Sequence, residues 1–214
     1  MKFLYSLGGG NIPVIREFDI EKTKEFKKGQ AVGISTDGVI CVGAVGGCIG
    51  IAAEDHTGEN DILNERNNGT RLRIDITKGG VYEVAAQRFT ATGGSKTTFV
   101  CNAEGVTTNL NNSKLVLVSK GENSENTDSI GTVRRVNSIS VSGASATFTV
   151  ESGACICTGD VYALIPEYGF KGYVGNDGES FCCAVGSNVT ELYVVNYNTD
   201  TFTLEVMPKK DYII

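Results

Sequence analysis

Apolar residues recur along this chain in short runs of four to eight positions, separated by glycine, asparagine and aspartate. Many runs alternate between apolar and polar residues or are rich in β-branched residues, which is typical of strands. The segment Thr70–Ile76 alternates strictly and predicts a half-buried strand, with Arg71, Arg73 and Asp75 on its polar face. Helical periodicity is almost absent, and only Asp19–Phe26 suggests a short helix or turn.

Turn signals join several of these runs into hairpins. Asp37-Gly38 lies between the apolar runs Ala31–Ser35 and Val39–Val42, and Asp-Gly is a strong hairpin signal. Asn198-Thr199-Asp200 separates the last two runs in the same way. The remaining predicted strands span residues 48–53, 81–86, 97–101, 114–119, 131–141, 146–150, 160–165, 172–174, 181–185, 191–197 and 201–207.

Short strands at this spacing predict an all-β fold with little helix: a small β-barrel plus a further sandwich-like or barrel-like region. We divide the chain into an N-terminal arm (1–16), a first β region (17–86), an inserted or second β region (87–166) and a last β region (167–214). We favour an arrangement in which the last region completes the barrel of the first. Lys120–Ser129 contains no apolar residue and predicts an exposed, mobile loop.

Composition narrows the classes of partner. The chain has 214 residues, a net charge of −6, 27 glycines, 3 prolines and no tryptophan. An acidic protein has no general attraction for nucleic acid or anionic lipid, so neither is expected as a partner. The apolar run at the N-terminus is too short for a signal peptide, and no run has the length of a membrane span. We therefore expect a cytoplasm-like compartment of synthesis.

The densest group of ionisable residues is Glu54-Asp55-His56, followed by Glu59 and Asp61. His56 is the only histidine, and no further residues with the repeated spacing of metal ligands accompany it. We therefore interpret this stretch as a solvated acidic loop. No familiar nucleophile, metal or cofactor motif occurs elsewhere. The sequence therefore predicts neither a catalytic site nor a bound metal or cofactor.

The chain has seven cysteines, and this odd number favours reduced and mostly buried thiols over a disulfide framework. Cys155 and Cys157 would share one face of a strand, whereas Cys182 and Cys183 would point to opposite faces. Neither pair has the spacing of zinc ribbons or redox motifs. A thiol nucleophile is not supported.

The order of motifs in the first region resembles the small β-barrel of capsid cement (head-decoration) proteins of tailed bacteriophages. The motifs are Phe26–Val32, Asp37-Gly38, Val39–Val42, Cys48–Asp55, Arg71–Ile76 and Gly80–Val84. A second set is similar to β domains of phage and prophage virion proteins. It comprises Lys114–Leu117, Gly131–Val136, Thr147–Val150 and Gly159–Pro166.

This resemblance implies a non-enzymatic virion protein that is made in the host cytoplasm and binds the outer face of the assembled capsid. It would stabilise the shell by bridging capsomers, with the major capsid protein and further copies of itself, favoured as a homotrimer, as partners. Expected contact residues lie in the apolar, glycine-loosened arm and in the apolar C-terminal tail: Phe3, Leu4, Tyr5, Leu7, Ile12, Val14, Ile15, Tyr212, Ile213 and Ile214. The alternative for the arm is a strand within its own domain.

Two other functions remain open from the sequence. One is a different β-rich virion component, such as a tail, fibre-base or head-fibre protein, or a module that binds a ligand such as a glycan. Loop 120–129 would then be the binding edge, although the absence of tryptophan weighs against a carbohydrate platform. The other is an enzyme that uses the loop around His56.

Overall fold

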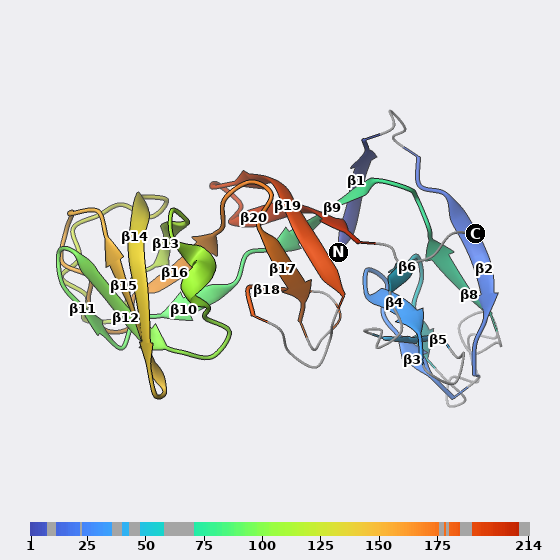
Figure 1. Ribbon diagram of the computed structural model, residues 1–214, viewed down its shortest axis with the longest axis horizontal. Coiled ribbons are helices and arrows are strands. Elements are labelled where there is room, and N and C mark those ends of the chain that lie inside the picture. Colours follow the sequence, from blue (N-terminus) through green and yellow to red (C-terminus); the bar gives the residue numbers. More distant parts are fainter. Residues whose placement is uncertain are drawn as a thin grey trace. The chain divides into compact units, whose positions relative to one another are not determined.

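The computed structural model describes residues 1–7, 12–21, 23–35, 40–42, 48–57, 71–175, 178, 180–184 and 190–209. The all-β prediction is confirmed, with 54% of residues in strands, 2% in helices and antiparallel sheets throughout (Figure 1). Within the described residues, none of the sheets closes into a barrel. No helix in this part of the chain is long and apolar enough to cross a membrane.

The chain forms two compact units. The first comprises Met1–Val84, Lys171–Val195 and Glu205–Ile214, and the second comprises Ala85–Phe170 and Asn196–Leu204. Each unit therefore combines segments that are distant in the sequence. Contacts between such segments have a high entropic cost of closure, which packing within each unit must offset.

A five-stranded sheet in the first unit contains most of the motifs from the first β region. Its order is β2 (Ile15–Asp19), β8 (Arg71–Asp75), β6 (Cys48–Ala52), β4 (Ala31–Ile34) and β5 (Ile40–Val42). The predicted hairpin is confirmed in its strands, because β4 pairs antiparallel with β5; its turn at Asp37-Gly38 lies outside the described residues. A separate pair, β3 (Glu25–Phe26) with β7 (His56–Thr57), accompanies this sheet.

The core of this sheet follows from the alternation of its strands. Leu72 and Ile74 are fully buried, as predicted for the apolar face of β8. Other buried members of this core are Ile20, Phe26, Val32, Ile40, Ile49 and Ala52. Gly50 allows close strand packing, because a Cβ atom there would lie 2.2 Å from the carbonyl oxygen of Asp75.

The polar face of β8 differs from the prediction at one residue. Arg71 is exposed and Arg73 is half-buried, but Asp75 is only 4% exposed. The prediction that Asp75 faces solvent is therefore wrong. A carboxylate can be buried at the end of a strand when hydrogen bonds compensate for its lost hydration, and Asp75 has such partners, as described below.

A six-stranded sheet includes strands from both ends of the chain. Its order is β1 (Lys2–Ser6), β9 (Gly80–Ala85), β20 (Thr203–Pro208), β19 (Glu191–Asn198), β17 (Lys171–Val174) and β18 (Phe181–Cys182). The predicted loop between the last two strands is an Asx turn, in which Asn198 Oδ1 accepts hydrogen bonds from the amides of Asp200 and Thr201. Residues 196–204, at this end of β19 and β20, belong to the second unit.

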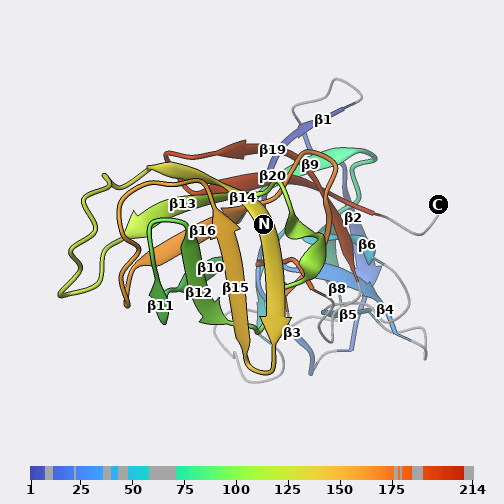
Figure 2. The ribbon, with the colours of Figure 1, turned by 60° about the vertical axis from the view of Figure 1, so that its left-hand side comes forward.

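The second unit contains a seven-stranded sheet. Its order is β10 (Arg88–Thr90), β16 (Val161–Ile165), β13 (Lys114–Ser119), β14 (Val133–Ser142), β15 (Ser145–Val150), β12 (Thr98–Asn102) and β11 (Gly93–Gly94). The long β14–β15 hairpin is seen side-on in Figure 1 and face-on in Figure 2. Its core is aromatic: the Phe99 ring lies 5.4 Å from that of Phe148 and 5.2 Å from that of Tyr162.

Loop 120–129 is tied to this core rather than freely exposed along its whole length. Asn126 is 3% exposed and donates hydrogen bonds from Nδ2 to Asp160 Oδ2 (2.8 Å) and Tyr162 Oη (3.0 Å). Asp128 forms a buried ion pair with Arg134. The expectation of an exposed loop therefore holds for neighbours such as Glu125 but not for Asn126.

Helical structure is confined to one described turn, the 3-10 helix η2 (Thr108–Leu110), which the sequence pattern does not predict. The segment Asp19–Phe26 contains a turn in which the Lys24 amide bonds the Glu21 carbonyl, followed by β3, and its described residues form no helix. Because few apolar residues in this segment share a helical face, the turn is its stable form.

Candidate functional site

The N-terminal segment enters the chain's own sheet. Strand β1 pairs antiparallel with β9, and the Phe3 ring packs edge-on against Tyr82 with 5.6 Å between ring centres. The Tyr5 hydroxyl donates a hydrogen bond to Glu205 at 2.8 Å. Phe3, Leu4 and Tyr5 are consequently half-buried within their own unit. Residues 2–6 therefore form a strand within their own domain, which was the alternative to an arm that docks on a partner.

The next residues of this segment display apolar side chains to solvent. Leu7 is 59% exposed, Ile12 is 82% exposed and Val14 is 50% exposed. Ile15 begins β2 and is half-buried. Tyr212, Ile213 and Ile214 lie outside the described residues. Within the described chain, the predicted contact residues that are free to meet a partner are therefore Leu7, Ile12 and Val14.

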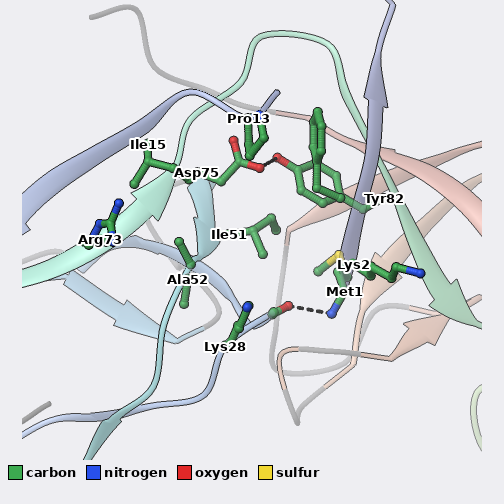
Figure 3. A pocket seen from close by; sticks show the side chains of 13 residues that line it. Met1, Lys2, Pro13, Ile15, Lys28, Ile51, Ala52, Arg73, Asp75 and Tyr82 are labelled. Atoms are coloured by element: carbon green, nitrogen blue, oxygen red, sulfur yellow. Dashed lines mark hydrogen bonds between the residues drawn. The ribbon is translucent and has the colours of Figure 1, made fainter. Parts of the chain in front are cut away.

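A pocket of about 620 Å³ lies between this segment and the five-stranded sheet (Figure 3). Its apolar lining comes from both sides: Met1, Phe3, Pro13, Ile15, Ile51, Ala52 and Ala53. Three cationic residues, Lys2, Lys28 and Arg73, also border it. Its volume lies in the range of sites for small ligands or for a side chain of a partner. Gly29, Asp75 and Tyr82 complete the lining.

Asp75 is fully committed to structural hydrogen bonds. Its Oδ1 accepts from the Thr77 amide (2.9 Å) and the Thr77 hydroxyl (2.5 Å), and its Oδ2 accepts from the Tyr82 hydroxyl (2.8 Å; Figure 3). The Val14 amide in turn donates to Thr77 Oγ1 at 2.8 Å. These bonds satisfy the buried carboxylate oxygens and fix the backbone beside Ile12 and Val14. The arrangement suits an anchor for the N-terminal segment better than an acid–base group.

A second connection fixes the first residue. The Met1 amino nitrogen donates to the Gly29 carbonyl oxygen at 2.7 Å (Figure 3). Gly29 has a left-handed φ of +93°, and a Cβ atom there would lie only 2.7 Å from the Met1 carbonyl oxygen. Glycine is therefore required at this position by both conformation and space.

The residues around His56 also serve structural roles. His56 is 2% exposed, donates from Nδ1 to the Lys24 carbonyl at 2.6 Å, and packs edge-on against Phe26. Glu54 and Asp55 accept backbone hydrogen bonds from the amides of Arg73 and Lys28, respectively. The interpretation as a solvated loop is therefore wrong for His56, whereas Asp55 is exposed and Glu54 is half-buried. Glu59 and Asp61 lie outside the described residues.

None of the seven cysteines forms a disulfide, and three of them, Cys48, Cys101 and Cys183, are buried. Burial raises the pKa of Cys101 to about 12 and that of Cys183 well above its usual value, so neither forms a thiolate readily. Cys155 is exposed, and the remaining three are partly exposed, so the expectation of mostly buried thiols is met only in part. Among the described residues, no His, Cys, Asp and Glu side chains cluster in a way that could hold a metal ion.

Comparison with protein-family models, curated proteins and solved structures gave no match to this chain. The candidate site therefore depends on geometry alone. The sequence pointed to the N-terminal segment by its apolar composition but did not predict the pocket. The pocket combines Pro13 and Ile15 with Ile51 and Ala52 from a strand far along the chain.

Proposed function

We propose that this chain is a structural protein of a tailed-phage virion that binds the outer surface of the assembled capsid and stabilises it by bridging capsomers. Its partners would be the major capsid protein and further copies of itself, with a trimer favoured. The five-stranded sheet and the β3–β7 pair contain most of the motifs that resemble cement proteins, and the last motif, Gly80–Val84, lies in β9 of the six-stranded sheet. In this proposal, that part of the first unit corresponds to their small barrel.

The observation that carries the proposal is the exposed apolar surface of the N-terminal segment. Leu7, Ile12 and Val14 are each at least half exposed, and the last two flank Pro13, which lines the pocket of Figure 3. Exposed apolar side chains on a backbone that is fixed by hydrogen bonds are typical of protein–protein contacts. A structural role needs many copies of such a modest contact rather than a catalytic group.

The charge around the pocket indicates the chemistry of the partner segment. Lys2, Lys28 and Arg73 border an otherwise apolar lining, while the only acidic lining residue, Asp75, is occupied by Thr77 and Tyr82. We therefore expect a capsid segment that inserts an apolar side chain next to a carboxylate. Opposite charges at the rim would favour the correct orientation and speed association.

The test is co-sedimentation of the purified chain with assembled capsids of the phage that encodes it. Saturable binding and greater resistance of the shells to heat are expected. The triple variant Leu7→Ser, Ile12→Ser, Val14→Ser should bind about 100-fold more weakly, since burial of three such side chains contributes about 1 kcal/mol each after allowance for partial exposure.

The matched control is Ile130→Ser, which removes an apolar side chain of similar exposure (60%) from the second unit. It should bind capsids as the unaltered chain does. Absence of binding by the unaltered chain would overturn the proposal and favour a tail or fibre role. Equal binding by the triple variant would refute the assignment of the contact surface.

A further inference from the structure

A second hollow, of about 470 Å³, lies on the surface of the second unit and shares no residue with the pocket of Figure 3. Its floor follows one row of the seven-stranded sheet, in which Ile165 of β16, Lys114 of β13 and Arg135 of β14 are directly opposite one another. Glu151 continues the row, because its amide bonds the Arg135 carbonyl at 2.9 Å. Arg134 points to the other face and is buried.

Two tyrosines border this hollow. Tyr168 is 78% exposed and stands on a turn that is closed by a hydrogen bond from the Phe170 amide to the Glu167 carbonyl. The left-handed φ of +78° at Gly169 allows this turn. Tyr197 is fixed by Lys114, whose Nζ contacts its hydroxyl and lies 4.4 Å from the ring centre. The hollow therefore presents an exposed aromatic face beside a positioned aromatic wall.

The polar groups of the hollow are both donors and acceptors, and their charges balance. Lys114 and Arg135 contribute two positive charges, and Glu151 and Glu167 contribute two negative charges. Arg135 Nη2 donates to Asn112 Oδ1 at 2.8 Å, and both side chains line the hollow. Asn112 has a left-handed φ of 67°, a conformation that asparagine adopts more readily than most non-glycine residues.

We propose that this hollow binds a neutral oligosaccharide. A sugar ring has an apolar face of C–H groups, which the exposed Tyr168 ring can cover, and hydroxyl groups that both donate and accept hydrogen bonds. Carboxylates of Glu151 and Glu167 suit the donating hydroxyls, while Arg135 and Asn112 suit the accepting ones. Zero net charge favours a neutral saccharide over an anionic or cationic ligand.

The proposed saccharide site differs from the binding edge that the sequence suggests. Loop 120–129 contributes no residue to the hollow. Tyrosine replaces the tryptophan that the chain lacks. The inference is independent of capsid decoration, since the hollow belongs to the second unit and uses none of the residues proposed to contact the capsid.

The test is binding of the full chain to an array of neutral and anionic oligosaccharides, followed by NMR titration with the neutral saccharide that binds best. Tyr168→Ala should weaken binding about tenfold through loss of the stacking face, whereas Tyr168→Phe should leave it within about threefold. Ile130→Ala, which shortens an exposed apolar side chain outside the hollow in the same unit, should have no effect. The titration should shift the Asn112 side-chain amide signals.

Three results would overturn the inference. The first is no binding to any neutral saccharide on the array. The second is a preference for anionic saccharides. The third is equal binding by the unaltered chain and the Tyr168→Ala variant, when the amide spectra show that both proteins are folded. Capsid binding by the same preparation is measured separately, so failure of one proposal is distinguishable from failure of the other.

Discussion

Replacement of Asp160 by alanine should destabilise the second unit strongly. Asp160 is completely buried, and its carboxylate accepts hydrogen bonds from the amides of Gly121 (3.0 Å) and Cys157 (3.1 Å) and from Asn126 Nδ2 (2.8 Å). Alanine would leave these three donors without their acceptor. Because two of them belong to loop 120–129, the variant should also free that loop from the sheet.

The magnitude of the destabilisation follows from the number of hydrogen bonds that are lost and from the access of water to their donors. Three hydrogen bonds to a charged group, at about 1.5–3 kcal/mol each, give an upper range of about 5–9 kcal/mol. Gly121 and Cys157 are partly exposed, so water can replace the carboxylate there, whereas Asn126 is 3% exposed. We therefore expect Asp160→Ala to lower the free energy of unfolding of this unit by about 3–5 kcal/mol.

The assay is urea unfolding monitored by amide NMR signals of β13 and β16, which reports the second unit without assuming that both units unfold together. Glu125→Ala removes an exposed carboxylate from the same loop and should change stability by less than about 0.5 kcal/mol. A loss below about 1 kcal/mol for Asp160→Ala, the net value of one neutral hydrogen bond, would refute the reasoning.

The pH dependence provides an independent check. Burial alone would raise the pKa of Asp160, but hydrogen bonds from Ser124, Asn126, Gly121 and Cys157 outweigh it and lower the pKa. The stability that this carboxylate contributes is therefore present above its unfolded pKa and is lost as the pH falls through the lower folded value. Asp160→Asn should abolish this component of acid destabilisation, and an unchanged acid profile would contradict the assignment.

Three further predictions concern other parts of the chain. Gly50→Ala should destabilise the first unit by at least about 1–3 kcal/mol in urea unfolding, because its Cβ would overlap the Asp75 carbonyl oxygen; a neutral effect would contradict the close strand packing. Cys155 should react with a thiol reagent in the folded protein, while Cys101 should react only after unfolding. Peptide mapping measures the labelling, and simultaneous labelling of both cysteines would argue against the buried position of Cys101. Hydrogen bonding to Lys171 lowers the pKa of Glu191 to about 2, so Glu191→Gln should remove a small stabilisation that is present above pH 4.5 and lost toward pH 2, measured by thermal unfolding.

Local alternation predicted most strands because it reports directly on a half-buried sheet. The run Lys114–Ser119 coincides with β13, and Gly172–Val174 lies within β17. By contrast, Lys2–Ser6 was assigned to an arm, although it forms β1. Its partner β9 begins at Gly80, and such a non-local pairing leaves no local pattern for a single sequence to reveal.

The candidate sites were less predictable because they depend on exposure and on buried polar groups. Alternation placed Asp75 in solvent, and only the Asp-x-Thr spacing to Thr77 signals a local side-chain hydrogen bond. His56 shows the same kind of error, since its acidic neighbours suggest solvation while its ring is buried and packs against Phe26. Composition identified the apolar N-terminal segment but not which of its residues remain exposed.

Asp75 and Asp160 are both buried carboxylates, and Asp75 also bears on the proposed contact surface. Each carboxylate loses its hydration on burial and is tolerated because at least three hydrogen-bond donors surround it. Asp75 holds Thr77, which holds the Val14 amide beside the exposed apolar residues. A surface fixed before binding loses less conformational entropy when a partner arrives. In the proposed complex, Asp75 would therefore favour binding through the backbone that it positions.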